Sequence, residues 1–292
     1  MAGIHESHSS LKISISAPAK INLTLETLRK RPDGYHEIRS VMQTISLSDT
    51  LIFQPVEGIT IKSDNSEWDG NKSLVSQAVK LLKERTGCTR GANIFIQKRI
   101  PWFSGLGGDS SDAAATLTGL NRLWGLGQSR EELMSLGGEL GSDVVFFFHG
   151  GTALAEGRGE IITPLPMIPH RWIVLLIPDI PQFPGKTRLA YQNLKPDYYT
   201  DGRITDEMVA ALRLGQGFDV SLMFNVFERI IFSLHPELEN SCQNMLNSGA
   251  PNVHLAGSGM TLFSLLDDSE KAKSLLSKLE MLGEKCYIAE TR

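Results

Sequence analysis

The sequence predicts an α+β fold, and two kinds of pattern support that prediction. Stretches in which apolar and polar residues alternate, as in half-buried strands, are interspersed with stretches that place apolar residues at helical spacing. In the second half of the chain, the order of these strands and helices suits a layer of helices packed over an antiparallel sheet. The length of 292 residues predicts two domains or one large domain.

The first predicted element is a strand over residues 11–25, "LKISISAPAKINLTL". Every odd-numbered residue in this stretch is apolar, and the even-numbered ones are polar apart from Pro18, where the strand is expected to bend. Because successive side chains of a strand point to opposite faces, Lys20 and Asn22 are expected on the same polar face.

Turn, strand and helix signals place the remaining elements of the first half. In chain order they are a tight turn at 31–36, a strand over about 40–53, a helix over 73–85 that stops before Gly87, a strand over 93–101, a helix from Ser110, a helix over 129–140, and a strand with a turn over 150–166. A capping box from Ser129 to Glu132 opens the helix at 129–140. Prolines at 164, 166 and 169 then indicate a boundary.

The second half opens with a buried strand, "RWIVLLIP", at 171–178. The elements predicted after it are helices near 186–194, 205–213, 219–235 and 236–247, a strand, glycine turn and strand over 252–266, a helix over 269–282, and a strand over 285–290.

Composition excludes several classes of protein. The net charge of -4 argues against a nucleic-acid-binding protein, which would normally carry a basic patch. No apolar run reaches the roughly 18 residues of a membrane span. The first ten residues, "MAGIHESHSS", are typical of a disordered tail rather than of a signal or transit peptide. Cys88, Cys242 and Cys286 have no metal-ligand spacing and favour a reducing cytoplasm.

The stretch "PWFSGLGGDSSDA", from Pro101, is a candidate phosphate-binding loop. Glycines let the backbone approach an anion, and the start of the following helix adds partial positive charge. The hydroxyls of Ser110 and Ser111 could cap the helix, bind phosphate or reach a metal. A tight turn without a ligand explains the glycines equally well. P-loop and protein-kinase motifs are absent from the sequence.

Two charged residues strengthen the interpretation as a phosphate site. Asp143 precedes the apolar run "VVFFFH", where a carboxylate must be paired or hydrogen-bonded to remain charged. Lys20, on the polar face of its strand, is a candidate partner. Taken alone, each has an ordinary structural explanation, as a helix-start aspartate and as a solvated strand lysine.

Together, these stretches resemble the GHMP kinases, and among them the 4-diphosphocytidyl-2-C-methyl-D-erythritol kinase family. The matching motifs are "APAKINLTL" at 17–25, "RPDGYHEI" at 31–38, "PWFSGLGGDSSDA" at 101–113, "LGSDVVFFFHGGTALAEGRGE" at 140–160 and "LAGSGMTLF" at 255–263. The resemblance runs from about residue 13 to residue 290, and the last motif alone is weak.

The resemblance implies a two-domain GHMP kinase fold. A domain like the second domain of ribosomal protein S5 is expected over 1–163, and a ferredoxin-like domain over 164–292. It also implies a kinase of non-mevalonate isoprenoid biosynthesis that binds ATP in the glycine loop and uses Mg²⁺ as cofactor. The expected acceptor is a cytidine-diphosphate alcohol between the domains, and its 2-hydroxyl is expected to receive the phosphoryl group. A cytoplasmic monomer or weak homodimer is expected, without nucleic-acid or membrane partners.

The resemblance further implies roles for individual residues. Asp143 is expected to be the general base, and Lys20 to keep it ionised and to stabilise the transferring phosphoryl group. The expected ATP-binding residues are Lys98, Pro101, Gly105, Leu106, Gly107, Gly108, Asp109, Ser110 and Ser111. The expected residues for the acceptor are Asn22, Tyr35, His36 and Thr187. Ser111 is also the expected metal ligand.

The chain departs from the family pattern at several positions. Trp102 and Phe103 make the outer lip of the loop bulkier, and Val145 and Val226 replace a proline and an aspartate. Asp109 replaces a glycine, and two positions are open to its carboxylate: it either faces the phosphates, directly or through Mg²⁺, or caps the helix that opens at Ser110. We favour the cap, because an unpaired carboxylate near phosphate would be unfavourable.

Two other functions remain open at this point. A mevalonate or homoserine kinase would keep the glycine loop but would not be expected to keep "PDGYH". A non-catalytic nucleotide-binding protein on the same fold would not need both Lys20 and Asp143.

Overall fold

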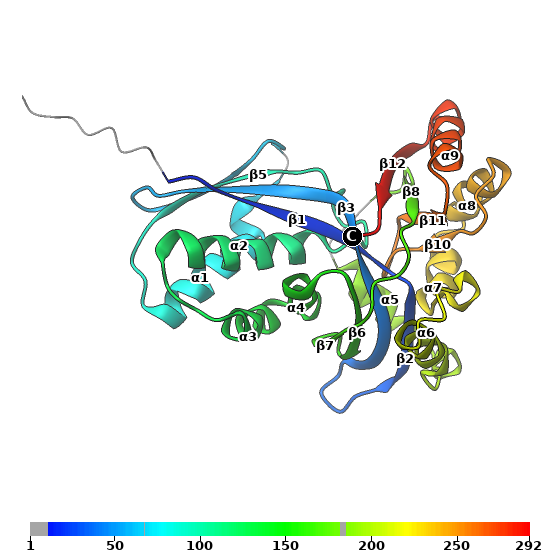
Figure 1. The fold of residues 1–292 in the computed structure, drawn as a ribbon, viewed down its shortest axis with the longest axis horizontal. Helices are drawn as coiled ribbons and strands as arrows, with labels where there is room; N and C mark the ends of the chain where they lie inside the picture. Colours follow the sequence, from blue (N-terminus) through cyan, green and yellow to red (C-terminus); the bar gives the residue numbers. More distant parts are fainter. Residues whose placement is uncertain (1–10, 67, 182–184) are drawn as a thin grey trace, which may run out of the picture.

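The computed structural model describes residues 11–66, 68–181 and 185–292 (Figure 1). The tail expected at 1–10 lies outside these residues. Within the described residues the fold is α+β, with two sheets, as the sequence predicts. No helix among them is both long enough and apolar enough to cross a bilayer.

The larger sheet has eight strands among the described residues. They are β1 (Ile13–Asn22), β2 (Thr24–Lys30), β3 (His36–Gln54), β4 (Ile59–Ser63), β5 (Ala92–Gln97), β6 (Thr152–Gly157), β7 (Ile161–Pro164) and β9 (Phe224–Asn225). The long strand β3 organises the sheet, because β1, β2, β5 and β6 all pair with it in antiparallel register.

Four helices lie together on one side of the long strands β1 and β3 (Figure 1). They are α1 (Leu74–Thr86), α2 (Gly108–Trp124), α3 (Arg130–Leu140) and α4 (Ser142–His149). Their apolar faces pack with the sheet in one core that includes Phe53, Leu117 and Trp124. The glycine loop joins β5 to α2 at the edge of this layer.

The smaller sheet has the order β10-β11-β8-β12. Its strands are β8 (Trp172–Ile177), β10 (His254–Leu255), β11 (Leu262–Leu266) and β12 (Lys285–Glu290), and all neighbours are antiparallel. The helices of this half are α5 (Lys186–Gln192), α6 (Arg203–Arg213), α7 (Phe227–Leu234), α8 (Leu238–Asn247) and α9 (Ser269–Met281). Short 3₁₀ turns lie at Gly70–Lys72, Pro196–Tyr198 and Val220–Leu222.

The two sheets share a hydrophobic core. Ile21 and Ile45 of the larger sheet belong to the same buried cluster as Ile173 and Phe263 of the smaller one. The chain also returns to the larger sheet at its end, where the Arg292 amide donates to the Thr44 carbonyl. The boundary expected between residues 163 and 164 falls inside β7, and the division into two domains at that position stays a prediction.

Several local predictions are confirmed by the backbone. The capping box is present, with both Ser129 and Glu132 hydrogen-bonded across the start of α3. Gly87 ends α1 in the left-handed conformation at a φ of 66°. The register of β1 against β3 shifts between Pro18 and Lys20, which is the expected bend.

Three predictions about elements are wrong in detail. The strand expected over 11–25 is divided between β1 and β2. The helix expected from Ser110 begins two residues earlier, at Gly108. The helix expected over 219–235 is instead a 3₁₀ turn, the short strand β9 and α7, because the backbone of residues 224–226 pairs with β2 instead of continuing a helix.

Candidate active site

Strand β1 carries Lys20 into the interior next to Asn22. The polar face expected to be partly solvated is covered here, and both residues are buried. Lys20 Nζ donates to Asn22 Oδ1 at 2.7 Å, and Asn22 Nδ2 donates to Ser40 Oγ of β3 at 2.8 Å. The chain of hydrogen bonds holds the lysine stem in one direction, toward the glycine loop.

The glycine loop is fastened to the same strand. The Lys20 amide donates to the Leu106 carbonyl at 2.9 Å, so the loop lies directly beside this lysine. Gly105 and Gly107 have φ values of 85° and 74°, in the left-handed region that favours glycine. At the start of the loop, Ser104 Oγ donates to the carbonyl of Pro101.

Gly107 shows why the loop needs residues without side chains. A Cβ added there would lie 2.9 Å from Phe147 Cζ and 3.1 Å from Lys20 Cγ. Gly107 is also the N-cap of α2, and within the described part of the chain no side chain caps the start of this helix. The first amides of α2 therefore have no capping side chain, and such a helix start can bind an anion.

Asp143 faces the lysine from the other side. It lies in the first turn of α4, after Gly141, and this short helix packs its valine and phenylalanine side chains into the interior. Asp143 Oδ2 is 3.6 Å from Lys20 Nζ, and 42% of the Asp143 side chain is exposed. The ion pair that the sequence indicated is therefore formed, with the lysine buried and the carboxylate open to a ligand.

The glycine turn between β10 and β11 closes over the loop. A Cβ on Gly105 would lie 2.1 Å from the Ala256 carbonyl oxygen, and one on Gly257 would lie 3.2 Å from Lys20 Nζ. Asn225 Nδ2 donates to the carbonyls of Leu255 and Gly257, which fixes the turn in place. No sequence pattern singled out Asn225 for this role.

Next to the glycine loop, Lys98, Asp49 and Asp112 form a buried ion cluster that no sequence pattern indicated. Lys98 Nζ is 2.6 Å from Asp49 Oδ2 and 2.8 Å from Asp112 Oδ2, and all three side chains are buried. Asp49 also accepts hydrogen bonds from the amides of Arg99 and Ile100, at the end of the segment that leads into the loop. The lysine expected near the nucleotide is thus held by two carboxylates that anchor this segment.

The cluster has more carboxylates than cations. Burial raises the pKa of Asp112 to about 7, against the opposing effect of Lys98, and Asp49 raises it further. Desolvation by its surroundings also raises the pKa of Asp109, although this side chain is exposed to solvent. Nothing in the sequence spacing links Asp49 to Asp112, because the two are brought together by strand pairing and by the start of α2.

The favoured interpretation of Asp109 as a helix cap is wrong. The N-cap of α2 is Gly107, and Asp109 lies inside the first turn of the helix. A carboxylate in the first turn still interacts favourably with the helix dipole. Its pKa is nevertheless raised, because desolvation outweighs the attraction to Lys98.

Aromatic residues from the turn before β3 and from α5 form an aromatic side of the candidate site, and Tyr191 brings it near Asp143. The Arg158 guanidinium lies 4.8 Å from the centre of the Tyr35 ring, and Tyr35 is 55% exposed. His36 stacks on Tyr191 of α5, with ring centres 4.9 Å apart, and burial lowers the pKa of His36. Asp143 contributes to raising the pKa of Tyr191, after the larger effect of burial. Neither Arg158 nor Tyr191 carries a sequence signal of its own that would have singled it out.

The start of α5 joins the glycine turn to this aromatic side. Thr187 Oγ1 and Ser258 Oγ are 2.7 Å apart, and Lys186 Nζ donates to the Gly259 carbonyl. Lys186 is buried, and the sequence analysis did not single it out. A lysine in a helical segment gives no sign in the sequence that it will be buried.

The Ser111 hydroxyl fits the role of a metal ligand. It is buried and has no hydrogen-bond partner among the described residues, which is unfavourable unless a ligand completes it. Ser110, its neighbour, is partly exposed. In the described part of the chain, no three histidine, cysteine, aspartate or glutamate side chains come together as a metal-binding group.

Comparison with known proteins agrees with this geometry. Residues 73–151 match the family model described as the GHMP kinases N terminal domain. The chain is 49% identical, over 96% of its length and 98% of the relative's, to 4-diphosphocytidyl-2-C-methyl-D-erythritol kinase of Dehalococcoides mccartyi. The enzyme of the same name from Geobacillus kaustophilus is 43% identical, with 94% and 99% of the two chains covered. The chain belongs to the 4-diphosphocytidyl-2-C-methyl-D-erythritol kinase family.

Solved structures place the fold among the GHMP kinases. A crystal structure of 4-(cytidine 5'-diphospho)-2C-methyl-D-erythritol kinase superposes with a TM-score of 0.80 at 31% identity, covering 96% of this chain and 99% of that one. A homoserine kinase from Cytophaga hutchinsonii has a TM-score of 0.72 at 17% identity, and covers 99% of this chain and 97% of that one. At that identity the likeness shows the shared fold alone.

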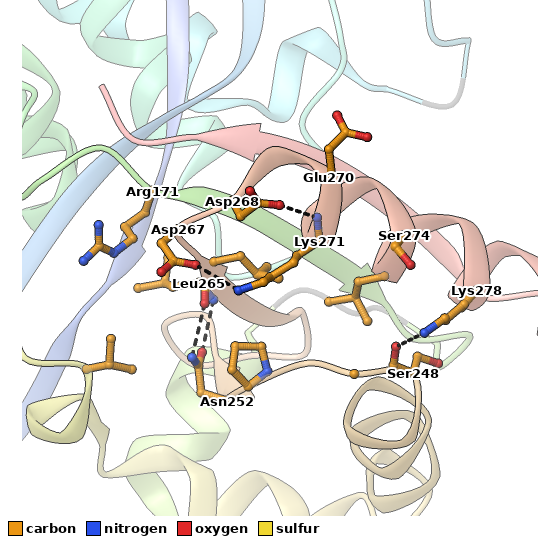
Figure 2. Close-up of a pocket in the computed structure, with 15 residues that line it drawn as sticks. Arg171, Ser248, Asn252, Leu265, Asp267, Asp268, Glu270, Lys271, Ser274 and Lys278 are labelled. Atoms are coloured by element: carbon orange, nitrogen blue, oxygen red, sulfur yellow. Dashed lines mark hydrogen bonds and ion pairs between the residues drawn. The ribbon is translucent and has the colours of Figure 1, made fainter.

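A separate cavity of about 920 Å³ lies away from the residues shared with the 4-diphosphocytidyl-2-C-methyl-D-erythritol kinase family motifs (Figure 2). It lies beside α9, and two of its lysines already have partners: Lys278 Nζ donates to the Ser248 carbonyl, and Lys271 pairs with Asp267.

Proposed function

We propose that this protein transfers the γ-phosphoryl group of ATP to the 2-hydroxyl of 4-diphosphocytidyl-2-C-methyl-D-erythritol, giving the 2-phosphate and ADP. The observation that carries the proposal is the ion pair between Lys20 and Asp143 beside the glycine loop. Phosphoryl transfer depends mainly on positioning and on charge stabilisation, and this pair offers both. The names of relatives at 40% to 49% identity support the choice of acceptor and a role in non-mevalonate isoprenoid biosynthesis.

In the proposed reaction, Asp143 orients the acceptor hydroxyl and takes its proton as the oxygen attacks the γ-phosphorus. The bond from that phosphorus to the bridging oxygen breaks, and ADP leaves. Lys20 has two effects: it pairs with the Asp143 carboxylate and so holds it in position, and it stabilises charge on the transferring group. The position of Lys20 between Asn22 and Asp143 supports both of these effects.

The glycine loop would hold the phosphates of ATP through its backbone amides and the start of α2. The buried Ser111 hydroxyl, which has no hydrogen-bond partner among the described residues, would be a ligand of Mg²⁺ next to the phosphates. A bound Mg²⁺ would neutralise part of the charge on the phosphates. Thr187 and the aromatic side near Tyr35 and His36 would receive the acceptor, with Tyr35 stacking on the cytosine and His36 hydrogen-bonding to it.

We place the reaction in the cytoplasm, in a monomer or a weak homodimer. The three cysteines are free, as expected for a reducing compartment.

Acceptor selectivity tests the proposed function. With ATP and Mg²⁺, phosphorylation of 4-diphosphocytidyl-2-C-methyl-D-erythritol should exceed that of mevalonate and homoserine by several orders of magnitude in kcat/KM, because neither alcohol carries a cytidine to fill the aromatic side. The measurement is ADP release in a coupled assay against the three alcohols. Comparable kcat/KM values for mevalonate or homoserine would contradict the assignment, and ATP binding without turnover of any alcohol would favour a non-catalytic nucleotide-binding protein.

Tyr35→Ala should raise the KM for the acceptor and leave the KM for ATP nearly unchanged. Stacking of an aromatic ring on a base contributes about 1–3 kcal/mol, so the acceptor KM should rise about 5- to 150-fold. Tyr35→Phe is the matched control, because it keeps the ring and should keep the acceptor KM within about threefold of wild type. Steady-state kinetics with each substrate varied in turn measures both. An equal rise in the two KM values would mean that Tyr35 supports the fold rather than the acceptor.

A further inference from the structure

Lys186 is a buried lysine that the proposed reaction does not yet use. It is the first residue of α5 and is 7% exposed. Its Nζ donates to the Gly259 carbonyl of the glycine turn. Burial of an ammonium group is unfavourable, so a lysine that is kept there calls for an explanation beyond packing.

The glycine turn places this lysine next to the phosphate-binding loop. A Cβ added to Gly105 would lie 2.9 Å from the same Gly259 carbonyl oxygen that Lys186 binds. In the same turn, a Cβ added to Gly257 would lie 3.2 Å from Lys20 Nζ. Lys186 and Lys20 therefore both lie against one short turn that packs on the phosphate-binding loop.

The two ammonium groups act on each other. Burial, and then the charge of Lys20 on β1, lower the pKa of Lys186 to about 7. Among the described residues near these two lysines, Asp143 of α4 is paired with Lys20, and Tyr191 on α5 is kept neutral by a raised pKa. The turn itself contributes carbonyl and hydroxyl groups. An anion bound between the two lysines would remove their repulsion and would favour the charged form of Lys186.

We propose that Lys186 is a second cationic residue that contacts the transferring phosphoryl group of ATP, alongside Lys20. This inference rests on the proposed function, because it assumes that the phosphates of ATP occupy the glycine loop. In the free protein at neutral pH, only part of the molecules carry a charged Lys186. Binding of ATP completes its protonation, so that both lysines are charged when the phosphoryl group is transferred.

The competing explanation is that Lys186 only ties α5 to the glycine turn. Lys186→Gln separates the two, because glutamine keeps a donor for the Gly259 carbonyl but carries no charge. Lys186→Arg keeps a permanent charge. Lys195→Met is the control, since this lysine follows the same helix but is exposed. Thermal unfolding and circular dichroism of each variant check that it is folded.

The decisive measurement is the number of protons taken up when ATP and Mg²⁺ bind without acceptor. It comes from calorimetric titrations at pH 7 in two buffers of different ionisation enthalpy. With a pKa of about 7, wild type should take up as much as about half a proton more than Lys186→Gln, and the protons released by ATP itself cancel in the comparison. Lys186→Arg should lack this uptake, and Lys195→Met should keep it.

Kinetics gives the second readout. Lys186→Gln should lower kcat by about 10²-fold, the usual scale for losing one electrostatic contact to a transition state, and raise the ATP KM less. Lys186→Arg should recover most of that loss. Equal proton uptake in wild type and Lys186→Gln, or a change confined to the acceptor KM, would overturn the inference while leaving the proposed function intact. If ATP binds with the expected uptake but another alcohol is phosphorylated, the proposed function fails and the inference stands.

Discussion

Asp143→Asn is expected to lower kcat by about 10²–10⁴-fold, the scale on which a positioned general base contributes. The amide cannot accept the proton of the acceptor hydroxyl, and it removes the negative charge that faces Lys20 at 3.6 Å. ATP affinity should change little, because the glycine loop is fastened to β1 by the Lys20 amide rather than by Asp143. Single-turnover kinetics measures the loss, and calorimetry measures ATP binding.

Asp267→Asn is the matched control for this variant, since that carboxylate is largely exposed and lies in the cavity beside α9 (Figure 2). It should keep kcat within about twofold of wild type. Lys20→Met should also lower kcat, and the double variant with Asp143→Asn should lose less than the product of the two single losses, because the residues act as a pair. Retention of more than a tenth of wild-type kcat in Asp143→Asn would remove it as the base.

Gly107→Val is expected to abolish measurable ATP binding. A residue other than glycine is strained at a φ of 74°, at a cost of roughly 1–2 kcal/mol. The new Cβ would press on Phe147 at 2.9 Å and on the stem of Lys20 at 3.1 Å, and its methyl groups would fill the loop where phosphate should bind. We expect the ATP Kd to rise at least about 100-fold, or roughly 2.8 kcal/mol, in a calorimetric titration.

The other end of the same helix supplies the control for Gly107→Val. Gly125 is the C-cap of α2, has a φ of 56°, and has open space where a Cβ would be. Gly125→Val should lower the melting temperature through backbone strain but keep the ATP Kd close to the wild-type value. If Gly107→Val bound ATP with near-normal affinity, the phosphates would have to lie elsewhere. If Gly125→Val lost ATP binding as well, the effect would belong to the stability of α2.

Much of the fold followed from local patterns. Alternation over residues 11–25 placed Lys20 and Asn22 on one face, and in the structure they are hydrogen-bonded at 2.7 Å. The Ser129 capping box and the glycine after α1 gave helix ends that are observed. One exception is β9, where a helix was expected but the chain pairs with β2 instead, because the amides of residues 224 and 226 donate to the carbonyls of Leu23 and Leu25.

For the candidate site, the sequence by itself determined which groups could act. The glycine loop, Lys20 and Asp143 were identified because their chemistry is carried by residue type and by short-range spacing, and the resemblance to a family joined them. The sequence named Lys20 only as a candidate partner of Asp143 and could not determine whether the two charges meet. The ion pair between Lys20 and Asp143 joins residues from β1 and α4, and it depends on how α4 packs against the larger sheet.

Tertiary structure alone decided the surroundings of the loop. In the fold, Lys98 is buried between Asp49 and Asp112, and Lys186 contacts the glycine turn. Asp109 lies in the first turn of α2 and not at the expected capping position. The physical reason is that burial and electrostatic environment are properties of neighbours in space. A lysine has the same side chain on a solvated helix and in a dry site, and only the fold determines which carboxylates, carbonyls and cations surround its ammonium group.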